Sequence, residues 1–264
     1  MDLTDRSNSI HAADHSVSMD LNDLRYQLIR LEDTIIFSLI ERAQFKQNKL
    51  VYTPNGIPLP DFKGSFLDWV VQETEVIHAK VRRYQSPDEY AFTADLPEPI
   101  LPPLTYPRFL HPNDINVNDK IKDYYVERII PAICEEGDDV NYGSAATIDI
   151  QCLQALSRRI HYGKYVAEVK YRSDPEKMNE LIRARDVGGL DAAITNAAVE
   201  KQVLERLGRK ARAYGRDPVE LNNDTTGAPA RVDVDTVVSM YRDWVIPLTK
   251  EVEVDYLLRR LDNA

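Results

Sequence analysis

Cationic side chains stand at positions where a helix would bury its face. The segment LSRRIHYGKYVAEVKY has the apolar pattern of a helix core, yet it contains Arg159 and Lys170. At 3.6 residues per turn, Lys170 returns to the azimuth of Arg159 three turns later, about 16 Å along the axis. The stripe between them carries Tyr162, Gly163 and Val166. If these two long basic side chains extend toward each other above the uncharged residues of the stripe, the gap between their charged ends has room for a small anion.

A simpler explanation of the same cations remains open. Lys and Arg often lay their aliphatic stems along apolar surface and keep the charge in water. On the opposite face of this helix lie His161, Lys164 and Glu168, and the last two are spaced for an i,i+4 ion pair. We expect this face to be the solvent side, so Arg159 and Lys170 need another explanation.

Polar side chains also occur on the apolar faces of other helical segments. In ITNAAVEKQVLERL, Asn196 and Glu200 are spaced i,i+4 on a stripe of apolar residues. In IPLTKEVEVDYLLRRL, Thr249 and Glu253 stand in the same relation. On the first helical segment, Arg25 sits among isoleucines and is expected to point inward or along a seam.

Each of these residues has a structural explanation as well. Asn196 is explained as a packing amide, Thr249 as a donor to its own i−4 carbonyl, and the two glutamates as partners in structural ion pairs. Together, however, they would place many polar groups against a helical core, at a cost of several kcal/mol unless a ligand satisfies them. A small polyanion that carries a hydroxyl group would do so.

Hydrophobic periodicity along the chain is that of helices. From Leu21 onward, Leu24, Leu28, Leu31 and Ile35 repeat at intervals of three and four residues, the spacing of one helix face. Further helices are predicted over residues 65–84, 116–133, 144–171, 175–184, 187–214 with a break, and 233–261. Strand alternation is not evident. We predict one all-α domain, a bundle of long and short helices.

Residues 87–112 contain seven prolines and therefore do not form a regular helix. Tyrosine, phenylalanine, leucine and isoleucine interleave with the prolines, and these side chains favour burial. We predict an extended connection that packs over the surface and joins helices, in place of a flexible linker between domains.

The overall composition excludes several classes of protein. A formal net charge of −10 argues against nucleic acid as the main partner, because phosphate binding needs a basic surface. The two cysteines and five histidines form no disulfide scaffold, redox motif or zinc signature, which suits a reducing cytoplasm. No apolar run reaches the length of a membrane span.

Residues 1–20 lack the apolar run of a signal peptide, and we expect a mobile tail before a domain at 21–264.

Several long motifs resemble the eukaryotic, fungal-type chorismate mutases, an all-helical class. The motifs, in chain order, are FKGSFLDW, NDKIKDYYVERIIP, LSRRIHYGKYVAEVKY, ITNAAVEKQVLERL and IPLTKEVEVDYLLRR, and the likeness covers nearly the whole chain from about Leu21. The resemblance implies a homodimer that rearranges chorismate to prephenate on the route to phenylalanine and tyrosine. The reaction is pericyclic, so the resemblance implies no nucleophile, metal or redox cofactor.

The resemblance also implies an active site, position by position. Its residues are Arg25, Arg159, Lys170, Asn196, Glu200, Thr249 and Glu253. The two arginines, with the asparagine and threonine, are implied to grip the substrate carboxylates, and Glu200 to take the ring hydroxyl. Lys170 and Glu253 are implied to donate to the ether oxygen, where negative charge grows. Because only a protonated acid donates, we expect apolar surroundings to raise the pKa of Glu253, with Lys170 opposing that rise.

An effector site at the dimer interface is a further implication, with tyrosine as inhibitor and tryptophan as activator. The matching positions are Arg82, Arg83, Gly143, Ser144 and Thr147. A helix that starts at Gly-Ser offers N–H groups to an amino-acid carboxylate, although by itself it is an ordinary helix start. One position departs from the family: Asp233 stands where the family has a threonine at the start of the last long helix, and Asp caps a helix equally well.

A second hypothesis belongs to a different class. The chain could be a catalytically silent helical protein of the same fold that acts as an aromatic amino-acid sensor or an interaction scaffold. A silent descendant would be expected to lose at least one active-site residue, and all seven are present here. Turnover of chorismate by the purified, metal-free protein discriminates between the two.

Overall fold

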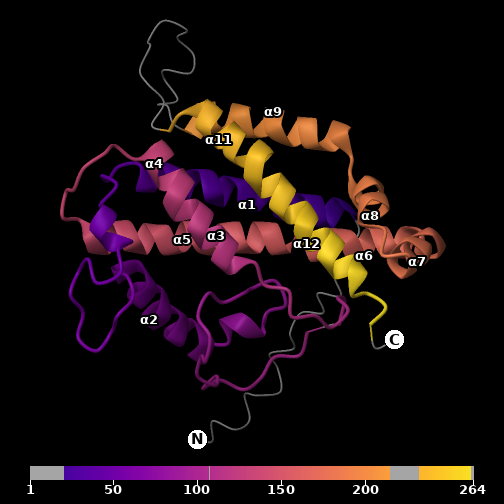
Figure 1. The fold of residues 1–264 in the computed structure, drawn as a ribbon, viewed down its shortest axis with the longest axis horizontal. Helices are drawn as coiled ribbons and strands as arrows, with labels where there is room; N and C mark the ends of the chain where they lie inside the picture. Colours follow the sequence, from indigo (N-terminus) through magenta and orange to yellow (C-terminus); the bar gives the residue numbers. More distant parts are fainter. Residues whose placement is uncertain (1–20, 107, 215–231, 263–264) are drawn as a thin grey trace, which may run out of the picture.

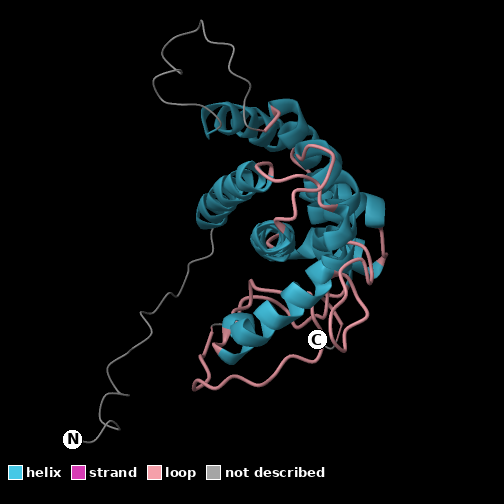
Figure 2. Cartoon of the chain, turned by 90° about the vertical axis from the view of Figure 1, so that its left-hand side faces the viewer, coloured by secondary structure: helices cyan, strands magenta, loops and turns pink. Residues whose placement is uncertain are grey.

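A computed structural model describes residues 21–106, 108–214 and 232–262. Within these ranges the chain consists of helices and loops, with no strand beyond one isolated β-bridge (Figure 2). The predicted all-α class is confirmed. The predicted tail at residues 1–20 lies outside the described residues. None of the helices in the described part of the chain is long and apolar enough to cross a membrane.

The helices follow the predicted order along the chain. They are α1 (Leu21–Arg42), α2 (Phe66–Lys80), α3 (Asn118–Tyr124), α4 (Ile130–Ile133), α5 (Tyr142–His161), α6 (Gly163–Ser173), α7 (Pro175–Arg183), α8 (Val187–Ile194), α9 (Ala197–Tyr214), α11 (Val234–Met240) and α12 (Ile246–Leu258). The single helix predicted over 144–171 is two pieces, α5 and α6, which meet at Tyr162 and run on in nearly the same direction (Figure 1).

Two of the predicted helices contain a wide turn directly before a proline. π-helical turns span Tyr125–Ile129, ahead of α4, and Tyr241–Val245, ahead of α12. Pro131 and Pro247 lie at the starts of the helices that follow. A proline inside a helix lacks one N–H donor and clashes with the carbonyl four residues earlier. A π turn widens the helix at that point, so the chain continues as one helical rod despite the proline.

The core is a bundle in which α1, α5–α6, α9 and α11–α12 pack against one another (Figure 1). Helix α1 lies against α5 and α9, and α12 crosses both α5 and α6. The apolar stripe predicted on the first helix faces this core, since Leu24, Leu31 and Ile35 are at most 8% exposed. Leu24 and Leu31 form a second, smaller cluster with Tyr162 and Tyr165. Side-chain packing along this stripe therefore sets the position of α1 on α5.

The proline-rich connection between α2 and α3 packs against the helices, as predicted. Glu75 of α2 is fully buried and accepts hydrogen bonds from the N–H groups of Phe92 and Thr93, at 3.0 and 2.7 Å. Asn118, at the start of α3, donates to the carbonyl of Ala91 at 2.8 Å. These bonds hold the middle of the connection to the helices on either side of it.

The prediction that His161, Lys164 and Glu168 face solvent is wrong. All three are at most 1% exposed, because the end of the proline-rich connection and the C-terminal part of the chain cover them. His161 accepts a hydrogen bond from the Val117 N–H at 3.0 Å, and Lys164 donates to the Ile115 carbonyl. Burial lowers the pKa of His161 to about 3 and that of Lys164 to about 7.

The ion pairs of Glu168 also differ from the prediction. Its partners are Arg172 at 2.8 Å and Arg260 at 2.7 Å, in place of Lys164. The Tyr256 hydroxyl donates to the same carboxylate at 2.6 Å. These contacts hold the C-terminal end of the chain against α6, and they lower the pKa of Glu168 even though its burial acts in the opposite direction.

Gly163 marks a close approach of α6 to α12. A Cβ at this position would lie 2.9 Å from the Thr249 carbonyl oxygen and 3.1 Å from Cγ of Glu253. We expect Gly163→Ala to push α12 outward and to lower the free energy of unfolding by about 1–3 kcal/mol, the usual cost of overpacking. Urea denaturation measures the loss. Gly143→Ala is the matched control, because an added Cβ there meets nothing within 4 Å. Equal stability of Gly163→Ala and the wild type would contradict the close approach.

Candidate active site

A cavity of about 150 Å³ opens where α12 crosses α5–α6 and the chain passes from α8 to α9. Six of the seven predicted catalytic residues line it: Arg159, Lys170, Asn196, Glu200, Thr249 and Glu253. The predicted stripe is only partly correct, because Gly163 and Val166 lie on the cavity wall whereas Tyr162 lines a different cavity. The structure therefore gathers polar groups from four helices around a small space.

Arg159 is a buried cation on the cavity wall, only 6% exposed. Among the described residues, its Nε has no hydrogen-bond partner and its guanidinium forms no ion pair. Its Cζ lies 5.9 Å from the centre of the Tyr241 ring. A buried charge without a counter-ion costs several kcal/mol. The cavity therefore presents an unsatisfied positive group to whatever enters it, and an anion would fit.

Lys170 and Glu253 face each other at the cavity. Lys170 Nζ lies 3.5 Å from Glu253 Oε2 and also donates to the Ile194 carbonyl. Burial raises the pKa of Glu253 to about 7, against the opposing charges of Lys170, Arg159 and Lys250. The expected direction of this pKa shift is confirmed. Glu253 is therefore protonated on the acid side of neutral and is then able to donate a hydrogen bond.

Thr249 and Asn196 have local partners and spare hydrogen-bonding capacity. The Thr249 hydroxyl donates to the Val245 carbonyl at 2.6 Å, as the structural explanation predicted. Asn196 is exposed, so it is not a packing amide; its Oδ1 accepts from the Val199 N–H at 3.2 Å at the start of α9. The Nδ2 group of Asn196 and the lone pairs of the Thr249 hydroxyl remain for a ligand.

Lys250 lines the cavity and was missed by the sequence analysis. Its Nζ lies 3.5 Å from the Glu200 carboxylate and 3.6 Å from that of Asp191. Glu200 is thus paired with a lysine, as its structural explanation predicted. The available signal was the i,i+4 spacing of Lys250 from Ile246, whose side chain also lines the cavity.

Arg25 does not line the cavity, and of its two expected placements, inward or along a seam, the inward one is wrong. Arg25 is exposed. The adjacent Leu24 packs into the cluster with Tyr162 and Tyr165, and successive residues of a helix point about 100° apart, which turns Arg25 toward solvent. Leu28, one turn later on the same face of α1, does line the cavity. Arg25 therefore lies one helical turn outside it.

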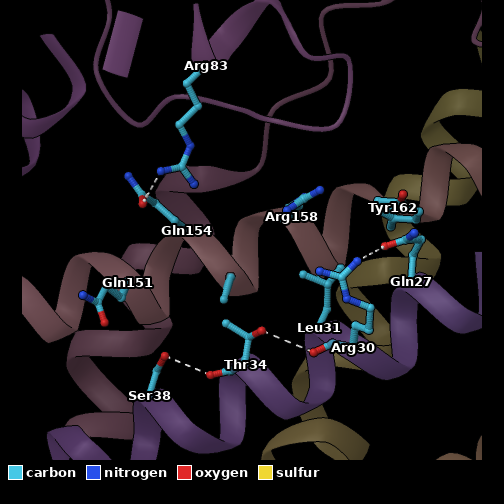
Figure 3. A pocket seen from close by; sticks show the side chains of 11 residues that line it. Gln27, Arg30, Leu31, Thr34, Ser38, Arg83, Gln151, Gln154, Arg158 and Tyr162 are labelled. Carbon is cyan, nitrogen blue, oxygen red and sulfur yellow. Dashed lines mark hydrogen bonds between the residues drawn. The ribbon is translucent and has the colours of Figure 1, made fainter. Parts of the chain in front are cut away.

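The predicted effector residues form two separate groups in one protomer. Arg83 lines a cavity of about 310 Å³ between α1 and α5, where its Nη1 donates to Gln154 at 2.9 Å (Figure 3). Its Nη2 and Nε groups donate to the Glu89 carboxylate at 3.1 and 3.2 Å. Arg82 has φ of 70° and donates to the Pro102 carbonyl. Both arginines thus lie just beyond the end of α2, and Arg83 contacts the middle of α5.

Gly143, Ser144 and Thr147 form the second group, which is exposed in the first turns of α5. The Asn141 side chain does not cap this helix, so N–H groups of its first turn remain for a ligand. Gly143 precedes Gln154 by eleven residues of the same helix, about 16 Å. The two groups therefore do not meet within one protomer.

Asp233 caps α11, as predicted. Its carboxylate accepts hydrogen bonds from the Thr236 N–H and the Thr236 hydroxyl, both at 2.8 Å. These bonds lower the pKa of Asp233. The aspartate at this position thus supports the start of the helix through its side chain.

Comparison with known proteins relates this arrangement to a family. A family model described as chorismate mutase type II matches residues 141–254, a range that contains the six predicted catalytic residues lining the cavity. A chorismate mutase of Trichoderma parareesei is 52% identical over 261 residues, covering 96% of this chain and 97% of that protein. The chain belongs to the chorismate mutase family. The family resemblance of the sequence motifs is confirmed.

Two solved structures of similar chains carry bound amino acids. The Aro7p chorismate mutase from Candida albicans, in complex with L-Trp, has a TM-score of 0.88 to this chain, with 48% identity and 93% of each chain covered. AtCM1 with tyrosine bound in its allosteric site has a TM-score of 0.84 and 44% identity, with 94% of this chain and 99% of that chain covered. The all-helical architecture is thus shared with chorismate mutases of known structure.

Proposed function

We propose that this chain catalyses the rearrangement of chorismate to prephenate, the step toward phenylalanine and tyrosine. The observation that carries the proposal is the buried Arg159 guanidinium, which has no ion-pair partner among the described residues and lines a cavity shared with Lys170 and Glu253. Membership of the chorismate mutase family supports it, as does the presence of all seven expected catalytic residue types.

The charge of the cavity suits a substrate with two carboxylates. Its lining carries three cations, Arg159, Lys170 and Lys250, and two carboxyl groups, Glu200 and Glu253. With Glu253 protonated, three positive charges and one negative charge leave a net charge of +2. This balances the two carboxylates of chorismate, and the small volume restricts the conformations that the substrate adopts.

In this proposal the carboxylates are held by two arginines and two neutral groups. Arg159 binds one carboxylate inside the cavity, with Thr249 and the Nδ2 group of Asn196 as further donors. Arg25 binds the other from the rim, which requires its long side chain to fold back over the turn that carries Leu28. Glu200 accepts a hydrogen bond from the ring hydroxyl. These contacts favour the compact, chair-like conformer in which the reacting carbons meet.

Lys170 and Glu253 act on the bond that breaks. The rearrangement cleaves a C–O bond as a C–C bond forms, and negative charge develops on the ether oxygen. Lys170 has three N–H donors, and its carbonyl and carboxyl partners use two. The third, together with the protonated Glu253, is available to the ether oxygen. Donors that are already in place when this charge develops lower the barrier without reorganisation.

Alanine substitutions at Arg159 and Lys170 test the assignment. We expect each to reduce turnover of chorismate by a factor of about a hundred or more, the usual loss when a donor to developing charge is removed, with helicity nearly unchanged and no loss of melting temperature. Loss of chorismate absorbance with metal-free protein measures turnover. Arg158→Ala is the matched control, since Arg158 precedes Arg159 but pairs with Asp88 outside the cavity. Full activity of Arg159→Ala would refute its role.

The same assay tests the competing hypothesis of a silent sensor or scaffold. If the folded wild-type protein does not turn over chorismate, that hypothesis replaces the proposed function. Family membership would still stand, because it rests on similarity over nearly the whole chain.

The protonation state of Glu253 predicts the pH dependence. Burial raises the pKa of Glu253 to about 7, and only the protonated form donates, so activity should fall as pH rises through about 7. Glu253→Gln supplies an N–H donor that does not titrate in this range and should remove that alkaline decline. Turnover from pH 5 to pH 9 for both proteins measures the effect. A wild-type rate that rises steadily toward pH 8, or the same falling limb in the glutamine variant, would remove Glu253 from this role.

We further propose a homodimer, in the cytoplasm, that binds tyrosine as inhibitor and tryptophan as activator between protomers. The effector residues lie in two groups that one protomer keeps apart, and both groups carry exposed apolar side chains. Val81 and Ile100, beside Arg82, are 50% and 74% exposed, and Val140, beside Gly143, is 73% exposed. Pairing the end of α2 with the start of a partner's α5 would cover these side chains and complete each site.

Tyrosine should raise the chorismate concentration needed for half-maximal rate, and tryptophan should lower it. Because effector and substrate binding are coupled reciprocally, a ligand bound in the substrate cavity should in turn weaken tyrosine binding. Calorimetry on the wild type and on an Arg82→Ala, Ser144→Ala double variant measures the binding. Val81→Asp with Ile100→Asp should yield a monomer by sedimentation and abolish the tyrosine effect. Undiminished tyrosine binding to the Arg82, Ser144 variant would exclude this site.

A further inference from the structure

Lys250 lies at the junction between the candidate active site and a neighbouring groove. It lines the substrate cavity together with Thr249 and Glu253, and it also lines a groove of about 460 Å³ between α8 and α12. Glu200 lines both spaces as well. Ile246 lines both spaces too, and these three residues form the boundary between the place where substrate is proposed to bind and the open surface.

The ammonium group of Lys250 connects three helices. It lies 3.5 Å from Glu200 Oε1 on α9 and 3.6 Å from Asp191 Oδ1 on α8, while the lysine itself belongs to α12. The Lys250 side chain is 24% exposed, against 34% for Glu200 and 49% for Asp191. The cation is thus the most shielded member of the group, and its position is set by carboxylates on two different elements.

An ordinary surface ion pair would explain these distances but would have no bearing on the reaction. Pairs of that kind contribute about 0–1 kcal/mol and are screened by salt, and Lys201 with Glu205 on α9 is an example, at 4.0 Å and with both side chains exposed. Lys250 differs because the carboxylate that it holds belongs to the cavity lining. The contact is made to Oε1, which leaves Oε2 of Glu200 to accept a hydrogen bond from a ligand.

We propose that Lys250 is a positioning residue for this reaction: it holds the Glu200 carboxylate in the orientation that receives the substrate hydroxyl, and it supplies one of the three cations that balance the substrate. This inference rests on the proposed function and extends it to a residue outside the seven. Lys250 acts through Glu200, so it determines how well the substrate is bound and oriented while the ether oxygen keeps its own donors, Lys170 and Glu253.

The same cation acts on Glu253, one turn further along α12. Three cations face this carboxyl group: Arg159 from α5, Lys170 from α6 and Lys250 from its own helix, and each lowers its pKa. The facing carboxylate from α9, Glu200, is paired with Lys250. Removing the charge of Lys250 therefore raises the pKa of Glu253. A merely structural lysine would have no such effect on the pH profile.

The test compares Lys250→Met, which keeps the length of the side chain without its charge, with Lys250→Arg and with the matched surface control Lys201→Met. We expect kcat/KM of Lys250→Met to fall about tenfold, the factor of a lost charge-assisted contact, mainly through a higher KM. We also expect the decline of its activity with rising pH to begin at a higher pH than in the wild type. Lys250→Arg should retain most of kcat/KM and the wild-type pH dependence, and Lys201→Met should match the wild type in both.

Combination with Glu253→Gln separates the two effects. In that background no carboxyl group titrates at position 253. Adding Lys250→Met should therefore raise KM without changing the pH dependence of the activity. Melting temperatures of all variants identify any that fail to fold, in which case the Lys250→Arg profile decides: a tenfold loss there, with the charge retained, would overturn the proposal. If Lys250→Met and Lys201→Met have the same KM and the same pH dependence of activity, the proposal is also overturned. An inactive wild type would instead refute the proposed function itself.

Discussion

The candidate active site depends on a guanidinium that the fold buries without an ion-pair partner among the described residues. Two other buried groups of this chain have ion-pair partners: Arg42 pairs with Asp149 at 2.7 Å, and Glu32 pairs with Arg206 at 2.7 Å. Arg159 lies at a comparable depth, yet it forms no ion pair within the part of the chain that the structure describes. Leaving such a charge unpaired costs several kcal/mol, which the packing of the bundle must supply. An anion that pairs with Arg159 in the cavity offsets this cost, so the unpaired charge contributes to the affinity for an anionic substrate.

Close packing of helices fixes the groups around that charge. Gly163 allows α6 to approach α12 so closely that a Cβ at this position would lie 2.9 Å from the Thr249 carbonyl oxygen. In the same region of contact between the two helices, Lys170 lies 3.5 Å from Glu253. The π turn before Pro247 allows the chain to pass a proline and still deliver Thr249 and Glu253 on one continuous rod. Positions on packed helices vary less than positions on loops, which suits a reaction that depends on the orientation of the substrate and of the hydrogen-bond donors around it.

Local periodicity predicted the helices and most of the site, because a stripe on a helix depends only on spacing along the chain. Arg159, Lys170, Asn196, Glu200, Thr249 and Glu253 were found this way, and they meet at one cavity. Contacts between distant segments were not predictable by the same means. His161 and Lys164 are buried by residues 115–117, more than forty positions earlier. Arg25 was expected to point inward or along a seam because of the pattern of its own helix. That pattern does not show where the helices packed against it end.

In the mechanism that we propose, protonation of Glu253 links the binding of the substrate to the chemical step. With its proton, the cavity lining carries a charge of +2 and offers a neutral acid to the ether oxygen; without the proton, the charge falls to +1 and the donor becomes an acceptor. One ionisation thus weakens both the attraction for a dianion and the stabilisation of developing charge. A residue that does not titrate would separate these effects. The glutamate instead makes both effects depend on one proton. Burial raises its pKa and three nearby cations lower it, so this proton is lost around neutral pH.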